Sequence, residues 1–142
     1  MAEGDASVHN NFKEQLLLKT IDCNTDVFKV ALYTAAYTWS VDGADVAYSA
    51  TNEIVASGYT AGGASIGTPV VSQDDTNDWA KWDDDGTDVT WTSLATCSPR
   101  HAVLYDDTTA TKWVCIHWEL ATDANGGDYT LAFGANGMLT IS

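Results

Sequence analysis

Apolar and polar residues alternate most clearly between positions 100 and 120. Two β-prone runs, 100–105 and 112–120, flank the polar stretch 106–111, which predicts a β-hairpin. One face of the second run is apolar throughout, with Val114, Ile116, Trp118 and Leu120. The other face is mixed, which is typical of a central strand that has one face in the core and one face partly covered. We therefore expect this hairpin to be the centre of the fold.

Period-two alternation also runs through much of the chain after position 26. The other runs that predict strands are 28–33, 53–59, 66–71, 89–92, 129–133 and 138–141. A total of about seven to nine short strands is typical of an all-β sandwich or barrel. The predicted fold is all-β, a single β-sandwich of jelly-roll or Ig-like type. The acidic stretch 73–88 is predicted to be a loop.

One short amphipathic helix is expected before the strands. Apolar residues recur at helical spacing at Phe12, Leu16, Leu17 and Ile21. Asn11 is a good N-cap, and Glu14 lies three residues later, as in a capping box. The polar residues before the helix have little to bury. The predicted organisation is an N-terminal arm over 1–11, a helix over 12–23 and a β-sandwich domain over 24–142.

The charge narrows the possible partners. Twenty Asp and Glu face only six Lys and Arg, which gives a net charge of −14. Nucleic acids and anionic membranes attract basic surfaces, so neither is an expected partner. The three cysteines are odd in number and widely spaced, which does not indicate a disulfide framework. No signal-like segment and no apolar run of membrane-spanning length is found, so synthesis in a cytoplasm is expected.

Metal binding has only loose support in the sequence. Cys97, His101, Cys115 and His117 are zinc-type ligands, and a turn centred on Thr109 would place His101 opposite His117, with Cys115 on the same face. Their spacing matches no common zinc motif, so the histidines are interpreted as cross-strand partners. The acidic stretches 74–78 and 83–88 do not fit the EF-hand pattern and are interpreted as solvated loops. We expect no metal and no cofactor, with His101, Cys115 and His117 as the nearest candidates.

Catalytic motifs are lacking, whereas aromatic residues point to binding. The chain has no Gly-x-Ser-x-Gly, Walker or His-Glu-x-x-His sequence, so we do not expect an enzyme. Trp79 and Trp82 lie in the acidic stretch, where exposed rings beside carboxylates would suit the faces of a sugar. This pair defines an alternative role, a platform that binds a carbohydrate.

The order of several stretches resembles that of small tailed-bacteriophage virion proteins. The stretches that carry the likeness are 12–17, 26–33, 48–53, 58–63, 88–91 and 102–106. Each motif is weakly specific, and their order and spacing are more specific. The likeness covers most of the chain after residue 11. Such proteins are head decoration, head fibre or tail components, and no catalytic residues come with the family. In a tail or fibre component, Trp79 and Trp82 would make the chain an adhesion module that binds a host surface glycan, which is the alternative role.

The resemblance implies a structural role in the virion, most simply as a capsid decoration or cement protein. The expected partner is the major capsid protein or another virion protein, and a homo-oligomer, favoured as a trimer, is expected to cover strand edges. The residues expected to contact the partner are Asn10, Asn11, Phe12 and Leu16. The protein would be made in the bacterial host cytoplasm and would end up in the virion.

Overall fold

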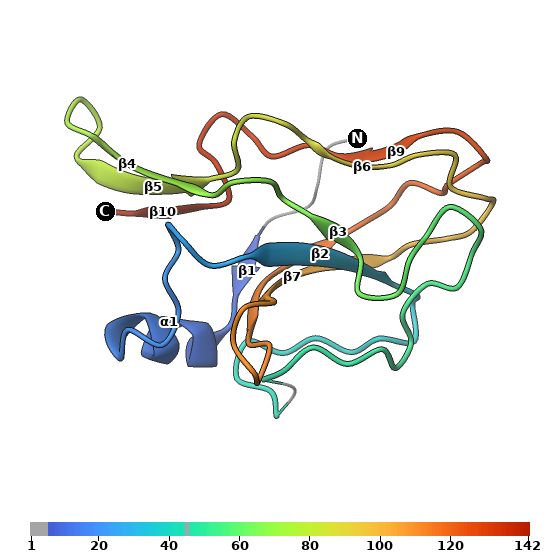
Figure 1. Cartoon of the computed structure of the whole chain (residues 1–142), viewed down its shortest axis with the longest axis horizontal. Coiled ribbons are helices and arrows are strands. Elements are labelled where there is room, and N and C mark those ends of the chain that lie inside the picture. The colour runs from blue at the N-terminus through green and yellow to red at the C-terminus, as the bar shows by residue number, and fades with distance from the viewer. Residues whose placement is uncertain (1–5, 45) are drawn as a thin grey trace.

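The computed structural model describes residues 6–44 and 46–142, which form a mostly β protein with several antiparallel sheets and one short helix (Figure 1). No helix in these two ranges has the length and apolar character that a membrane crossing needs. The elements are β1 (Ser7–Val8), α1 (Asn10–Leu17), β2 (Phe28–Tyr33), β3 (Ala64–Ser65), β4 (Val70–Asp74), β5 (Trp79–Asp83), β6 (Val89–Trp91), β7 (His101–Asp106), β8 (Val114–Glu119), β9 (Tyr129–Leu131) and β10 (Leu139–Ile141).

The predicted hairpin lies inside the largest sheet. Its strands β7 and β8 are the inner members of a five-stranded sheet with the order β1-β8-β7-β2-β3. β2 pairs with β7 along its whole length, from Phe28 opposite Asp106 to Tyr33 opposite His101. The alternation that predicted the hairpin arises because one face of this sheet packs into the main core. That face contributes the buried side chains of Phe28, Val30, Leu32, Ala102, Leu104, Ile116 and Trp118.

Two smaller sheets lie over this core face. One has the order β10-β5-β4, and the other pairs β6 with β9. Figure 1 shows both on the same side of β2 and β7. They contribute Trp82, Val89, Trp91, Tyr129 and Leu131 to the same buried cluster. The all-β prediction is thereby confirmed at the level of antiparallel sheets.

The acidic stretch is not a loop throughout, contrary to the sequence prediction. Residues 79–83 form β5, the middle strand of the three-stranded sheet. The sequence obscured this strand because only one of its side chains, Trp82, is fully buried, and acidic residues follow it directly. A single large aromatic ring is enough to fix the strand on the core, whereas a periodicity criterion needs several apolar positions.

The helix is shorter than predicted and begins earlier. It starts at Asn10 and is capped by His9, whose Nδ1 accepts a hydrogen bond from the backbone N–H of Asn11 at 3.1 Å. Asn11 is therefore inside the first turn and is not the N-cap. The helix ends at Leu17 because Lys19 adopts a left-handed conformation, with φ of 58°. A lysine gives no sequence signal for such a stop, which glycine usually provides.

The predicted arm is partly built into the fold. Ser7 pairs with His117 and Val8 with Ile116, so β1 forms one edge of the five-stranded sheet. His9 is buried and donates its backbone N–H to the carbonyl of Cys115 at 3.0 Å. The arm prediction is therefore wrong for residues 7–11, while residues 1–5 lie outside the described residues. The helix is also no separate unit, since Phe12 is in the main core.

The segment 34–53, which the structure describes except for residue 45, covers the outer face of the five-stranded sheet. Figure 1 shows this chain on the side of β2 opposite β4 and β5. A second buried cluster lies beneath it, made of Ala31, Tyr33, Val103, Tyr105 and Val114, with Tyr37, Trp39 and Tyr48 packed against it. An aromatic layer therefore joins the segment to the sheet.

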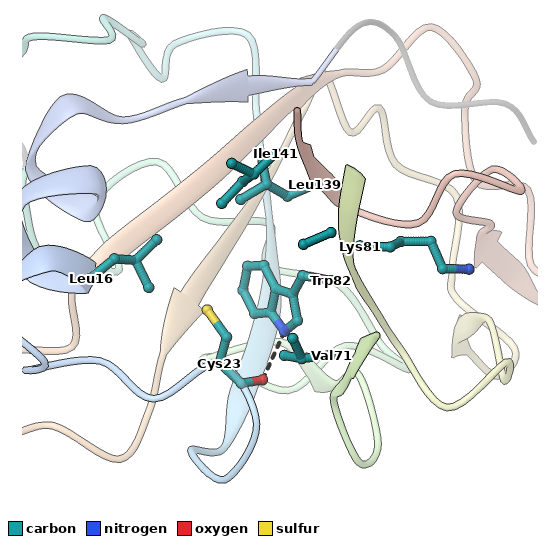
Figure 2. Close-up of a pocket in the computed structure, with 8 residues that line it drawn as sticks. Leu16, Cys23, Val71, Lys81, Trp82, Leu139 and Ile141 are labelled. Atoms are coloured by element: carbon teal, nitrogen blue, oxygen red, sulfur yellow. Dashed lines mark hydrogen bonds between the residues drawn. The ribbon is translucent and has the colours of Figure 1, made fainter. Parts of the chain in front are cut away.

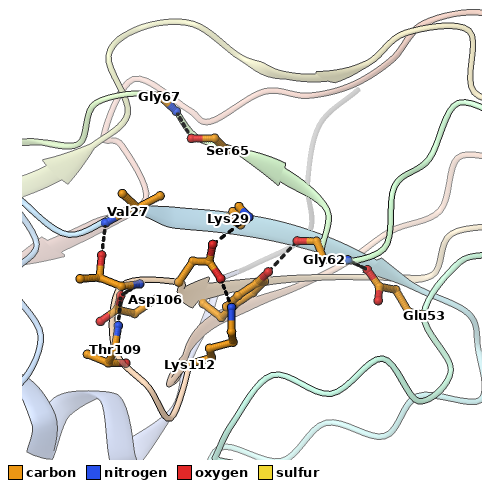
Figure 3. Close-up of polar contacts among 12 residues, drawn as sticks. Val27, Lys29, Glu53, Gly62, Ser65, Gly67, Asp106, Thr109 and Lys112 are labelled. Atoms are coloured by element: carbon orange, nitrogen blue, oxygen red, sulfur yellow. Dashed lines mark hydrogen bonds and ion pairs between the residues drawn. The ribbon is translucent and has the colours of Figure 1, made fainter.

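Buried polar groups add directional bonds to this layer, among them the bond between Glu53 and the Gly62 N–H (Figure 3). The Glu53 carboxylate accepts hydrogen bonds from the Tyr48 hydroxyl at 2.7 Å, the Tyr59 hydroxyl at 2.5 Å and the Gly62 N–H at 2.7 Å. The Tyr59 hydroxyl in turn accepts from the Leu32 N–H at 2.9 Å. Because Glu53 is only 6% exposed, it links two loops to β2 in a water-poor site.

Candidate functional site

An apolar groove runs between α1 and β10. Its wider part, about 490 Å³, is lined by residues of β1, α1 and β10, and its narrower part, about 260 Å³, continues to β4 and β5. Leu16, Leu139 and Ile141 line both parts. Figure 2 shows their side chains around the same hollow as Trp82 and Cys23. The groove is therefore one continuous surface formed by elements from both ends of the described chain.

Large apolar side chains at this groove remain in solvent. Leu17 is 86% exposed and Ile141 is 62% exposed. Val71 on β4 is also about half exposed and lines the narrower part. Single exposed apolar residues are ordinary, but a contiguous group of them around a hollow usually marks a surface that binds another molecule. This group is the strongest binding feature that we find in the described residues.

Two open strand edges flank the groove. β10 is the outermost strand of the three-stranded sheet, and β1 is the outermost strand of the five-stranded sheet. An edge strand presents backbone N–H and C=O groups that can pair with another chain. Val8 of β1 and Thr140 of β10 line the wider part of the groove together. A partner could therefore meet apolar side chains and backbone hydrogen-bonding groups at one place.

The groove carries one cation that has no ion pair in the described residues. Lys13 lines the wider part of the groove, and its ammonium donates to the Asn10 side-chain oxygen at 3.0 Å. Four of the other cations lie within ion-pair distance of an aspartate, in the pairs Lys29–Asp107, Lys81–Asp83, Arg100–Asp123 and Lys112–Asp107. Lys13 is therefore available to a carboxylate of a partner.

The structure brings together only part of the predicted partner-binding set. Phe12 and Leu16 both line the groove, but Phe12 is fully buried and belongs to the core. Asn10 and Asn11 do not line it, and the Asn10 N–H donates to the carbonyl of Val41. Leu17, Leu139 and Ile141 were missed. A signal for Leu17 was present, because three consecutive leucines at 16–18 cannot all face the core from one short helix.

The predicted metal candidates do not meet at one point. His101 Nδ1 lies 2.9 Å from His117 Nε2, so the two rings share a hydrogen bond across β7 and β8. Cys115 instead belongs to the main core, and its thiol donates to the carbonyl of Trp113 at 3.4 Å. Burial raises the pKa of this thiol well above its ordinary value. In residues 6–44 and 46–142 no cluster of three or more His, Cys, Asp or Glu side chains could hold a metal ion.

A β-bulge explains why the cysteine and the histidines separate. The ladder shifts register between Leu104 and Tyr105, which face Ile116 and Val114 and leave Cys115 without a direct partner. An extra residue in one strand reverses the alternation on one side of it. Val114 accordingly lies in the outer cluster and Cys115 in the core, opposite to the sequence prediction. His101 is also paired with Glu119, and not directly with His117.

All three histidines lie along one aromatic row on the outer face. His9 meets Trp39 edge-on with ring centroids 5.4 Å apart, and Trp39 stacks on His117 at 4.6 Å. Tyr37 lies 5.6 Å from the His101 ring. Burial lowers the pKa of both His101 and His117, and Glu119 partly opposes this shift at His101. Within this row, burial therefore favours the neutral form of His101 and His117.

Acidification is expected to destabilise the protein through His117. Burial, and secondarily the neighbouring His101, lowers the pKa of His117 from 6.5 to about 4. The unfolded chain binds this proton at a higher pH than the native protein does. The contribution of neutral His117 to the free energy of unfolding is therefore complete above pH 6.5 and declines as the pH falls towards about 4. The expected loss reaches about 3 kcal/mol. An NMR titration of the imidazole protons checks this, and a midpoint at the ordinary histidine value would contradict it.

The predicted glycan platform of two tryptophans does not exist. Trp79 and Trp82 are three residues apart on β5, so their side chains point to opposite faces of the strand. Trp82 is 4% exposed, stacks on Phe12 at 5.6 Å and donates its Nε1–H to the Cys23 carbonyl at 2.9 Å. Trp79 alone is half-buried, in a hollow beside Asp74 and Lys81.

The acidic loops use carboxylates to hold their own backbone. Asp74 accepts hydrogen bonds from the side-chain amide of Asn77 and from the N–H groups of Asn77 and Thr76, and these interactions lower its pKa. Asp85 accepts from the N–H groups of Thr87 and Thr68. The Asp84 carboxyl differs, because burial raises its pKa. Aspartates therefore stabilise turns in both stretches, which were interpreted from the sequence only as solvated loops.

Comparison of the chain with family models, with curated proteins and with solved structures gave no match. The geometry of the chain itself is therefore the basis for inferring its function.

Proposed function

We propose that this chain is a structural protein of a tailed-bacteriophage virion, most simply a capsid decoration protein that docks through the α1–β10 groove. The observation that carries the proposal is the contiguous exposed apolar surface formed by Leu17, Ile141 and Val71 beside two open strand edges. The order of motifs described above, which resembles that of small virion proteins, supplies the virion context. The proposed role is binding and not catalysis.

The expected partner is the major capsid protein or another virion protein. A complementary segment would place apolar side chains in the groove and a carboxylate near Lys13. Association as a homo-oligomer, with a trimer favoured, would cover the edges of β1, β4 or β10. We also assign the two facing layers of sheets to a β-sandwich. The remaining acidic surface would face solvent and limit aggregation of particles.

The mechanism is stabilisation by mass action. A protein that binds only the assembled shell lowers the free energy of that shell relative to unassembled subunits. No chemical step is needed, and the size of the effect depends on affinity and copy number. A copy number close to that of the major capsid protein, measured by quantitative mass spectrometry of purified particles, would support decoration of the whole lattice. Complete absence from particles would refute the virion assignment.

A charge placed in the groove is expected to abolish docking without unfolding the protein. Leu17→Asp and Ile141→Asp put carboxylates on side chains that are exposed in the isolated chain, so each should change the free energy of unfolding by about 0.5 kcal/mol or less. Bound to a partner, each carboxylate would be buried in an apolar contact, and attachment should weaken at least roughly tenfold. Copy number on particles measures the effect.

Val55→Asp is the matched control for these variants. Val55 is 97% exposed and does not line the groove, so the same charge change there should leave attachment intact. If particles carry the Leu17→Asp protein at the normal copy number, docking through the groove is refuted.

A further inference from the structure

A small pocket lies between the segment 34–53 and the outer face of the five-stranded sheet. It encloses about 190 Å³, and its lining includes Tyr33, Tyr37, Ser49, Thr51 and Asn52. Figure 1 places this segment on the side of β2 away from β4 and β5. The pocket is therefore formed by different elements from the groove, and it does not depend on the docking role proposed above.

The described part of the lining is neutral, which is unusual in this chain. The eight described residues that line the pocket carry no charge, whereas 18% of all residues are charged. A second hollow of about 200 Å³ shares Tyr37 and Thr38 with the pocket and extends to Trp39, and its described lining is also uncharged. Neither an anionic nor a cationic ligand would find a counter-charge on these described residues.

The Tyr37 ring forms the accessible aromatic wall of the pocket. It is half-buried and lies against the fully buried ring of Tyr33, with the two centroids 4.3 Å apart and the planes inclined by 30°. The Tyr33 hydroxyl donates to the Ser49 carbonyl at 2.8 Å, which fixes the segment against the sheet. The wall is thus rigid before any ligand arrives, and a preorganised wall lowers the entropic cost of binding.

Hydroxyl and amide groups form the opposite wall. The hydroxyls of Ser49 and Thr51 lie 3.2 Å apart and bond to each other, and both residues are solvent-exposed. The Asn52 amide donates to the Ala36 carbonyl at 3.1 Å, and Asn52 adopts a left-handed backbone with φ of 66°. Asparagine adopts this conformation more readily than most residues, and the bond to Ala36 fixes its side-chain amide.

We propose that this pocket is a binding site for a neutral sugar residue. A pyranose ring has an apolar C–H face that packs on aromatic rings and equatorial hydroxyls that need neutral donors and acceptors. The Tyr37 ring and the Ser49–Thr51–Asn52 wall provide these two surfaces. The pocket is smaller than the roughly 300–1,000 Å³ of drug-sized sites, so it would hold one sugar residue.

The test is an NMR titration of the full chain with the methyl glycosides of glucose, galactose, mannose and N-acetylglucosamine. For at least one glycoside, saturable shifts are expected in the backbone amides of residues 33–38 and 47–52. Thr51→Val keeps the side-chain shape at an exposed position and removes one hydroxyl, so affinity should fall severalfold. Tyr37→Ala removes part of the aromatic wall and should abolish binding.

Trp79→Ala is the matched control, because Trp79 lies in a different hollow that contains charged residues. It should leave the titration unchanged. Saturable shifts that are lost in Thr51→Val and kept in Trp79→Ala would support the site. The proposal is overturned if none of the four glycosides gives saturable shifts, if the shifts map to the Trp79 hollow, or if Thr51→Val binds as tightly as the natural sequence.

Discussion

Replacing Trp82 with alanine is expected to lower the free energy of unfolding by about 3–5 kcal/mol, the usual cost of truncating a large buried aromatic residue. Trp82 fastens β5 to the core, where its ring stacks on Phe12 and meets Phe28 edge-on at 4.8 Å. Its Nε1–H also satisfies the Cys23 carbonyl. Urea unfolding followed by circular dichroism measures the loss.

Trp79→Ala provides the comparison from the same strand. Trp79 is only half-buried and lies outside both buried clusters, so its truncation should cost about 1 kcal/mol or less. Equal losses for the two variants would mean that Trp82 is not the residue that holds β5 on the core. The same two variants distinguish the buried tryptophan of β5, which a ligand cannot reach, from the half-buried one.

Removing the Glu53 carboxylate is expected to cost about 4 kcal/mol. In Glu53→Ala, two tyrosine hydroxyls and the Gly62 N–H lose their acceptor in a buried site, at about 1–3 kcal/mol for each group left unpaired. The loss of stability is smaller where water can enter and bond to an unpaired group. Hydrogen exchange of the Gly62 amide should accelerate together with the drop in stability, and both can be followed on one sample.

Two further substitutions define the role of Glu53. Glu53→Gln retains one carbonyl acceptor and should recover part of the stability, because at least one tyrosine hydroxyl keeps a partner. Glu119→Ala removes an exposed carboxylate and should change stability by about 0.5 kcal/mol or less. If Glu53→Ala is as mild as Glu119→Ala, the network does not hold the two loops on β2.

The sequence was informative where alternation is strict and uninterrupted. β2 and β7 were predicted within a residue or two because their core-facing side chains alternate without a break. The same rule failed at Val114 and Cys115, because the bulge adds one residue and local periodicity contains no sign of it. The predicted His–Cys cluster was lost for that reason. The contact between His101 and His117 survived because diagonal neighbours on a sheet can still touch.

The groove could be predicted only in part, because it forms where distant elements meet. Leu16 could be assigned to an amphipathic helix, but nothing local indicates that Ile141 lies beside it. The long 34–53 segment has weak periodicity, and its cover over the sheet depends on Tyr33, Tyr48 and Glu53 meeting in three dimensions. Tertiary contacts of this kind become visible only once the strand order is known.

The strand order also affects how the chain folds during synthesis. β2 pairs with β7, from Phe28 opposite Asp106 to Tyr33 opposite His101, so it emerges from the ribosome well before its partner exists. At about 5–20 residues per second, this interval lasts roughly 4–16 s. During that time Phe28, Val30 and Leu32 are exposed on a strand that still lacks β7. Slower translation of the chain between β2 and β7 should therefore increase aggregation of nascent chains, whereas the same slowing after β8 should have little effect.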